Sequence, residues 1–295
     1  MTLLSDYSLQ VQELIHDLAG IDFSQSELTS RINQARQVVA LNTHCVRQFF
    51  TGLNMITNQE TYPIKGGIGG CQLLTAGANY TSPIVSFSGG GGTGAAASAT
   101  LGTGGSIALI TMTNWGSGYT SAPSVSITGG AGAGATASAI CLANVLDIYT
   151  VSVLWGQQRP MLEWLPFSKF QAYCRLNTRT TTSPPSIWTE YWEQNVFYLF
   201  GIPTQNWIFE LDTICNSTPL VNTTDLDTQI LQPYDDAVQY YAAYLCMIKL
   251  QQFGHAQFFK GEFEERMRRL QATSKSPRVY NHYLNMDARM RRLFY

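Results

Sequence analysis

The 295-residue chain is 45% hydrophobic and 12% aromatic, which is enough apolar surface to bury a core. Its net charge of -2 argues against a general basic surface for nucleic acid, and no apolar run approaches the roughly 20 residues of a membrane-spanning helix. Acidic residues near the N-terminus argue against a signal peptide, so we expect a protein made and folded in a cytosol, with no membrane partner.

Charge divides the chain into three regions. No Asp, Glu, Lys or Arg lies between Lys65 and Asp147. Residues 255–295 hold 9 of the 18 Lys and Arg against 4 of the 20 acids, a local net of +5. Residues 1–254 therefore carry 9 basic and 16 acidic groups, a net of -7. We expect an acidic body, a neutral middle and a basic C-terminal arm.

Two helices are predicted at the start of the chain. The first has apolar residues at helical spacing over Val11–Leu18. The second begins at a capping box, Ser24–Glu27, and is expected to end at Gly52. Its predicted buried stripe is Leu28, Ile32, Ala35, Val39, Val46 and Phe49.

An antiparallel sheet is predicted next, with an interruption. A strand at Tyr62–Ile64 breaks off, and ordinary strand patterns resume at Asn144–Trp155. A short helix is expected after Ser168. Further strands, separated by turns, are predicted at 160–165, 186–192, 195–200 and 206–214.

Two more helices are predicted near the C-terminus. Pro233 suits a first helical turn, and apolar residues at helical spacing continue to Gly254. The face predicted for the helix that follows is Phe259, Phe263, Met267 and Leu270.

An internal repeat fills the interruption, residues 69–142. The segment from Tyr80, YTSPIVSFSGGGGTGAAASAT, matches YTSAPSVSITGGAGAGATASAI from Tyr119, 39 residues later. Each copy alternates apolar residues, then has a glycine cluster and a run of small residues, which predicts strand, turn and strand. We expect two stacked hairpins, because one glycine-rich hairpin is too weak alone. The alternative is a flexible glycine-serine linker.

The residue patterns predict no catalytic, cofactor or metal site. Gly89, Gly91 and Gly94 have dinucleotide-loop spacing, but no acidic residue follows before Asp147, and a glycine-rich turn is the better interpretation. The four histidines have no metal-ligand spacing. Glu190 and Glu193 are better explained by two strands joined by a polar turn than by a hydrolase acid pair.

Cysteines and aromatic residues of the repeat region leave alternatives open. Cys71 and Cys141 lie near its two ends, where a disulfide is conceivable, although most of the six cysteines are expected to be buried thiols. Tyr80, Trp115 and Tyr119 either stack on a ligand such as a sugar ring or close the hairpins, and we favour the second role.

The C-terminal arm mixes arginines with apolar anchors, a composition suited to ordering on a partner rather than to a solvated chain end. The predicted partner-binding residues are Arg278, Tyr280, Tyr283, Met286, Arg289, Met290, Arg291, Arg292, Leu293, Phe294 and Tyr295.

Several packing patterns resemble the head-to-tail adaptor (connector) proteins of tailed bacteriophages. They are LTSRINQARQVVALNTHCVRQFF with ETYPI, VLDIYTVSVLWGQQRPMLEWLPFSKFQAYCR, NVFYLFGIPTQNWIFELDT and PYDDAVQYYAAYLCMIKLQQFGHAQFF, covering residues 1–65 and 144–273. The repeat is absent from a minimal adaptor and is similar to small β modules of other phage structural proteins.

The resemblance implies an α+β fold: a bundle of N-terminal and C-terminal helices, an antiparallel β-sheet and a small all-β inserted domain. The implied domains are an adaptor core at 1–68 and 143–254, the insert at 69–142, and a C-terminal helix and arm at 255–295.

The implied function is structural, with no enzymatic activity and no cofactor. The protein forms a homo-oligomeric ring, commonly of twelve copies, at the virion head-tail junction. It links the portal protein, which the arm binds, to a tail or nozzle protein, and genomic DNA passes through its lumen. The alternative is a glycan-binding or host-surface-binding virion protein that acts through the inserted β-domain.

Overall fold

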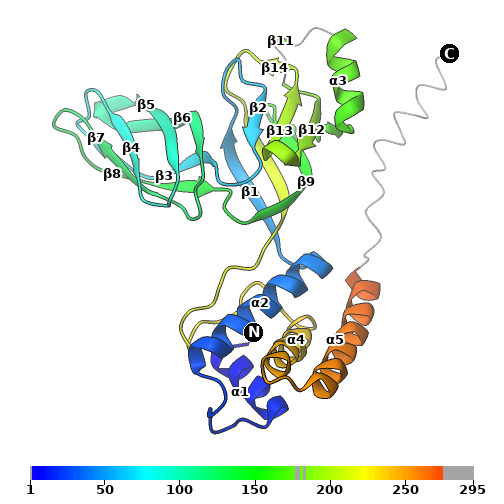
Figure 1. Cartoon of the computed structure of the whole chain (residues 1–295). Helices are drawn as coiled ribbons and strands as arrows, with labels where there is room; N and C mark the ends of the chain where they lie inside the picture. Colours follow the sequence, from blue (N-terminus) through cyan, green and yellow to red (C-terminus); the bar gives the residue numbers. More distant parts are fainter. Residues whose placement is uncertain (1, 177–179, 182–183, 275–295) are drawn as a thin grey trace. The chain divides into compact units, whose positions relative to one another are not determined.

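The computed structural model describes the chain apart from residues 1, 177–179, 182–183 and 275–295 (Figure 1). Helices and largely antiparallel sheets are both present, which confirms the mixed α+β class. Contacts within the chain divide it into two units. The helical unit comprises Met1–Val46 and Ser217–Tyr295, and the β unit comprises Arg47–Asn216.

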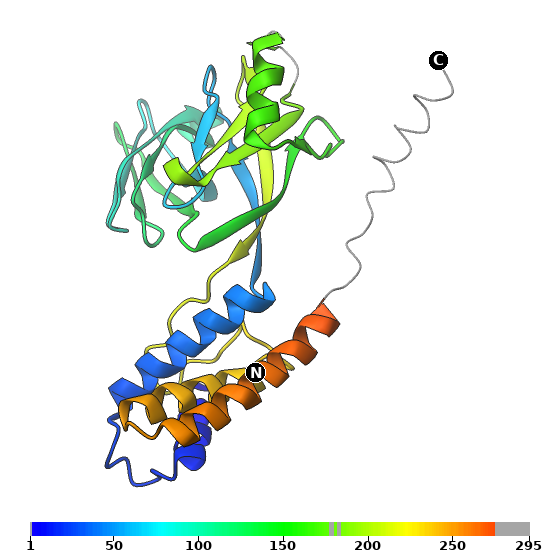
Figure 2. The ribbon, with the colours of Figure 1, turned by 45° about the vertical axis from the view of Figure 1, so that its right-hand side comes forward.

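Four helices make up the described helical unit. They are α1 (Leu4–Ile15), α2 (Gln25–Thr43), α4 (Asp235–Lys249) and α5 (Phe253–Ser274). Helix α4 contacts each of the other three (Figure 2). The predicted face of α5 is confirmed, since Phe259, Phe263, Met267 and Leu270 are all buried.

Helix boundaries differ from the predictions at three places. The N-cap of α2 is confirmed, because the Ser24 hydroxyl accepts the Glu27 N–H. The predicted end of α2 at Gly52 is wrong: the helix stops at His44, whose φ of 53° is left-handed. Helix α1 likewise ends at His16, before Leu18, and α4 ends at Lys249 rather than continuing to Gly254.

Strand pairing explains the early end of α2. Residues Arg47–Asn54 form β1, which pairs with β15 (Ile208–Cys215) far along the chain. Phe49, predicted to be buried on the helix, is 54% exposed on this strand. A non-local ladder has therefore overridden a pattern that also fits a helix.

A buried ion pair crosses the helical unit. The Arg36 guanidinium on α2 donates two hydrogen bonds to the Asp227 carboxylate, at 2.7 and 2.9 Å, and both side chains are almost fully buried. Asp227 also accepts the backbone N–H groups of Gln229 and Ile230, and Arg36 donates to the Thr218 carbonyl. These bonds hold the segment before α4 against α2, and the Arg36 partnership keeps the pKa of Asp227 below its ordinary value despite its burial.

Replacing Arg36 with Met is expected to destabilise the protein by about 3–5 kcal/mol, because it leaves the Asp227 carboxylate buried without its cation. Urea unfolding followed by circular dichroism measures this. Arg31→Met on the same helix, where the guanidinium donates to the Gln34 side chain, is the control and should change stability by less than about 0.5 kcal/mol. Equal effects of the two substitutions would contradict the assignment.

Two small sheets form the body of the β unit. One has the order β1-β15-β9, with β9 at Val145–Leu154. The other has the order β10-β12-β13-β2, at Glu163–Trp164, Ile187–Tyr191, Val196–Phe200 and Thr61–Pro63. Helix α3 (Phe167–Leu176) packs on the second sheet through Phe170 and Cys174. A short parallel pair, β11 (Thr180–Thr181) with β14 (Ile202–Pro203), completes these strands.

The repeat region folds as one six-stranded sheet, which we call the repeat sheet (Figure 1). Its strands are β3 (Ile68–Ala78), β4 (Ile84–Ser88), β5 (Thr93–Leu101), β6 (Ile107–Ser117), β7 (Ser124–Thr128) and β8 (Ala133–Cys141). The strand order is β3-β8-β7-β4-β5-β6. Exchanging β3, β4 and β5 with β6, β7 and β8 gives the same order read from the opposite edge. The sheet therefore has an internal two-fold pseudosymmetry.

Pairing within this sheet differs from the predicted stacked hairpins. The two strands predicted to form a hairpin are paired at one position in each repeat. That position is Ile84 with Ser98 between β4 and β5, and Ser124 with Ser138 between β7 and β8. The extended ladders instead join one repeat to the other, with β4 along β7 and β3 along β8. The edge strands β3 and β6 also contact each other, so the sheet curls towards closure. Pairing across repeats lets the glycine-rich strands support each other.

Trp115 on β6 anchors the repeat sheet in the core of the β unit. Its indole N–H donates to the Asn54 carbonyl at 3.0 Å, and the Asn54 side chain accepts the Met112 N–H at 3.3 Å. The indole stacks on Phe209, with ring centroids 5.6 Å apart and an interplanar angle of 4°, and contacts Tyr62 at 5.0 Å. The repeat sheet and the two smaller sheets consequently share one aromatic core.

Trp115→Ala is expected to cost about 3–5 kcal/mol, because it empties an aromatic site and leaves the Asn54 carbonyl without its donor. Chemical unfolding monitored by circular dichroism provides the measurement. The control is Trp155→Ala, since Trp155 is 50% exposed and its truncation should cost clearly less, about 1–2 kcal/mol. A Trp115 variant as stable as the Trp155 variant would show that the anchor is unimportant.

Candidate interaction surfaces

The predicted partner-binding residues of the arm, Arg278 to Tyr295, lie outside the described residues. Helix α5, which precedes them, has its basic groups paired along its own surface. Lys260 pairs with Glu264, Arg266 with Glu262, and Arg268 and Arg269 with Glu265. The unbalanced positive charge of the C-terminal region is therefore concentrated in residues 275–295, which hold five Lys or Arg and one Asp.

Tyr80 and Tyr119 are buried and link the two repeats reciprocally. The Tyr80 hydroxyl accepts the Ala135 N–H of the second repeat at 3.2 Å, and the Tyr119 hydroxyl accepts the Ala95 N–H of the first at 3.4 Å. The rings cover Gly132 and Gly92, where an added Cβ would come within 2.4 Å of a ring carbon. Both tyrosines are therefore covered in this structure and join one repeat to the other, rather than closing a hairpin within one repeat.

Trp115, the third ligand candidate of the repeat region, is 1% exposed in the aromatic core. None of the three rings has a face open to solvent in this structure. A sequence alone could not distinguish these positions from exposed ones, because the partners that cover them come from the other repeat and from β15.

The outer face of the repeat sheet carries small, uncharged side chains. Ser86 and Ser126 lie opposite each other at its centre, with their hydroxyl oxygens 2.8 Å apart. Thr75 and Thr136 make a similar pair at 2.7 Å. Ile84 is exposed beside them, and Leu74, Leu101 and Leu109 are further exposed apolar side chains of the repeat sheet. The inward alternate residues, Val85 and Ile127 among them, pack on a small core around Tyr80. This pattern gives the sheet an uncharged face.

An exposed aromatic tip lies at the hairpin that joins β9 to β10. The backbones of Trp155 and Gln158 exchange hydrogen bonds of 2.9 and 3.0 Å, which makes a tight turn. Trp155, Met161 and Trp164 are each about half exposed on this hairpin. Exposed aromatic residues and methionine are enriched at protein contact surfaces.

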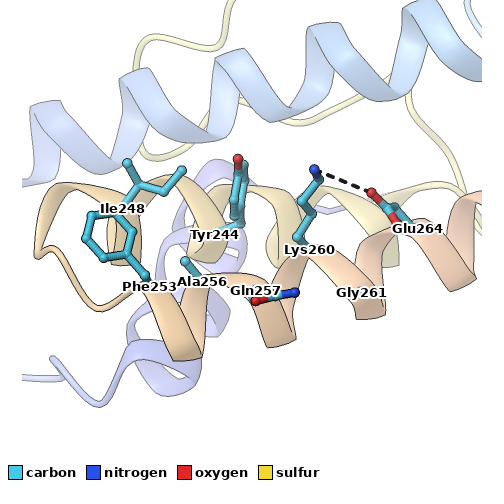
Figure 3. Close-up of a pocket in the computed structure, with 8 residues that line it drawn as sticks. All are labelled: Tyr244, Ile248, Phe253, Ala256, Gln257, Lys260, Gly261 and Glu264. Carbon is cyan, nitrogen blue, oxygen red and sulfur yellow. Dashed lines mark ion pairs between the residues drawn. The ribbon is translucent and has the colours of Figure 1, made fainter.

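A groove of about 540 Å³ runs between α4 and α5 (Figure 3). Its apolar end contains Ile248 and Phe253, which are 39% and 67% exposed. The lining residues are Tyr244, Ile248, Phe253, Ala256, Gln257, Lys260, Gly261 and Glu264. The helix pair therefore offers a concave, mainly apolar surface within the helical unit. The sequence pattern of α5 identified its buried face but not this groove.

A carboxyl pair in the β unit was missed by sequence reasoning. Burial, together with the neighbouring Asp147 carboxylate, raises the pKa of Glu190 to about 7. One Glu190 oxygen is buried without a hydrogen-bond partner. Glu193, the partner considered from the sequence, instead accepts a hydrogen bond from the Tyr191 hydroxyl at 2.7 Å. The two glutamates flanking Trp192 thus have separate partners, and the relevant neighbour of Glu190 comes from β9, more than 40 residues earlier.

The described residues contain no group of three or more His, Cys, Asp or Glu side chains placed to hold a metal ion. All six cysteines are free, so the conceivable Cys71–Cys141 disulfide is not formed. Burial raises the pKa of Cys71 to about 12 and that of Cys141 to about 11, which keeps both thiols protonated at neutral pH. The glycines at 89–94 lead into strand β5, whereas a dinucleotide loop requires a helix there.

No protein-family model matches the chain, and no curated protein sequence is significantly similar to it. Across the part of the chain that the structure describes, no helix is long and apolar enough to cross a membrane.

Glu190→Gln is expected to stabilise the protein at pH 8 by about 1 kcal/mol after allowance for solvent screening, which corresponds to a Tm increase of about 2–4 °C. The raised pKa means that the folded state holds this proton more tightly than the unfolded state. Its stabilising contribution is therefore complete below the ordinary value of 4.5 and is lost as pH rises through about 7.

Thermal unfolding of both proteins between pH 4 and 9 measures the effect, and the two Tm curves should diverge mainly between pH 5 and 8. Glu193→Gln is the control, because Glu193 is exposed and its carboxylate accepts a hydrogen bond from the Tyr191 hydroxyl. A Glu190→Gln curve parallel to that of the parent protein throughout would contradict the assignment.

Proposed function

We propose that this chain is a virion structural protein, a head-to-tail adaptor that forms a ring beneath the portal of a tailed bacteriophage. The observation that carries the proposal is the presence of apolar contact surfaces on both units: the aromatic tip of the β unit and the α4–α5 groove of the helical unit. A protein that works by repeated binding around a ring requires contact surfaces rather than a reaction centre.

In this proposal the four helices act as the bundle of an adaptor core, and the repeat sheet acts as an inserted domain between its strands. Two features support that division. The sequence resemblance stops at residue 65 and resumes at 144, on either side of the repeat sheet. The ends of the insertion are adjacent, since the Gly66 N–H donates to the Leu142 carbonyl and the Leu142 N–H donates to the Gly67 carbonyl. An insertion with adjacent ends disturbs its host little.

Charge supports a passage for DNA in the same proposal. The described helical unit holds 12 carboxylates and 7 Lys or Arg, a net of -5, and the repeat region has no charged side chain from 66 to 146. Neutral or acidic walls would not retain the phosphates of a moving duplex as a basic surface would. The basic residues 275–295 are then available for the portal protein.

The glycan-binding alternative is less favoured, because the three residues proposed to contact a glycan are not exposed. Tyr80, Trp115 and Tyr119 are buried. The uncharged outer face of the repeat sheet is better suited, in our proposal, to contact with a neighbouring subunit or a tail protein.

Removal of residues 275–295 is expected to abolish binding to DNA-filled, tailless heads while leaving the fold intact, because the proposed portal-binding groups are removed and the described helices are kept. Co-sedimentation with the heads measures binding, and circular dichroism checks the fold. Replacing Leu293, Phe294 and Tyr295 with Ala should weaken binding at least tenfold, a loss of about 1.4 kcal/mol or more. A truncated protein that sediments with heads like the full chain would refute the role of the arm.

A further inference from the structure

The α4–α5 groove has a polarity that runs along α5. Ile248 and Phe253 lie at one end, and the Lys260–Glu264 ion pair, 3.7 Å between charged atoms, lies towards the C-terminal end of the helix (Figure 3). Gly261 leaves space in the lining, since an added Cβ there would meet nothing within 4 Å. The groove can therefore hold side chains of another segment, with apolar groups at one end and a cation near Glu264.

The chain itself contains a segment with this composition. Its last five residues are Arg291, Arg292, Leu293, Phe294 and Tyr295. Two cations are followed directly by three large apolar side chains, and this order matches the order of the groove for a segment that returns along α5 from its C-terminal end.

The electrostatic balance also favours this pairing. The described helical unit has a net charge of -5, from 12 carboxylates and 7 Lys or Arg. Residues 275–295 carry five Lys or Arg and one Asp, a net of +4. Opposite charges of similar size promote encounter between the two parts and are screened by salt.

We propose that the α4–α5 groove binds residues 291–295 of the same chain, with the arginines at Glu264 and the apolar residues at Phe253 and Ile248. The proposal goes beyond the adaptor function and does not depend on it.

Chain length allows the contact. Gly261 and Ser274 are 13 residues apart on α5, about 20 Å at 1.5 Å per residue. Residues 275–290 span up to about 50–58 Å when extended, more than twice that distance. Tethering places the segment at an effective concentration in the millimolar range, so a weak contact is sufficient.

The spacing within the groove agrees as well. Glu264 and Phe253 are eleven residues apart on the helix, about 16 Å along its axis. The five residues from Arg291 to Tyr295 make four steps, about 13 Å when extended, and the arginine side chain reaches the rest of the way to Glu264. In the free protein this contact would hold the apolar chain end away from other partners, and a portal protein would have to compete for it.

The test places a photoreactive benzoylphenylalanine at position 294 of the full-length protein, without any partner present. After irradiation at low micromolar concentration, mass spectrometry locates the crosslinks. We expect crosslinks within one chain to peptides from α4 and α5 between residues 244 and 264.

Gly261→Phe fills the groove in the same protein, and it should lower these crosslinks about tenfold, equivalent to about 1.4 kcal/mol. The substitution replaces a mid-helix glycine with a better helix former, so folding is maintained. Gly254→Phe is the matched control: Gly254 is also on α5 with nothing within 4 Å of an added Cβ, but it does not line the groove.

Crosslinks that are unchanged by Gly261→Phe, or that fall elsewhere on the chain, would overturn the proposal. Crosslinks between two copies that increase with protein concentration would overturn it too, in favour of a second copy as the occupant. Because no heads or portal are used, these results are independent of the binding of the arm to a portal.

Discussion

The β unit depends on one side chain of the repeat region, Trp115. Its indole lies among Tyr62, Phe197 and Phe209, which come from β2, β13 and β15, and its N–H bonds to Asn54 on β1. One residue therefore connects three sheets. The repeat region has no charged groups and few large side chains, so this aromatic contact gives it much of its attachment to the rest of the unit.

Two-fold pseudosymmetry explains how such a glycine-rich segment folds at all. The tyrosine of each repeat packs against the other repeat. Equivalent backbone bonds also recur, because the Tyr80 N–H donates to the Gly105 carbonyl and the Tyr119 N–H donates to the Gly66 carbonyl. Gly92 and Gly132 are required beneath the tyrosine rings, because any Cβ would overlap a ring carbon. The glycine clusters thus serve close packing and tight turns, and neither repeat is complete without its counterpart.

Local patterns predicted most elements, and non-local partners decided what they could not. Ser24 and Glu27 marked the start of α2 correctly, but its end was set by the pairing of β1 with β15. The sequence predicted the repeat from Tyr80 onward but not its first strand. That strand, β3 in one repeat and β6 in the other, begins IGGCQLL and IALITMT, which share almost no residues at equivalent positions. The roles of Trp115 and Glu190 depend on neighbours more than 40 residues distant, which no local spacing reveals.

The protein has three surfaces suited to binding: an aromatic hairpin tip, an uncharged sheet face and a helical groove. The native mass of the full-length protein, measured alone and after mixing with DNA-filled, tailless heads or isolated portal, tests the adaptor proposal most directly. The proposal predicts a monomer of 32.7 kDa that assembles into a multi-subunit ring when the portal is present. A monomer that neither binds the portal nor assembles on it would contradict the proposal.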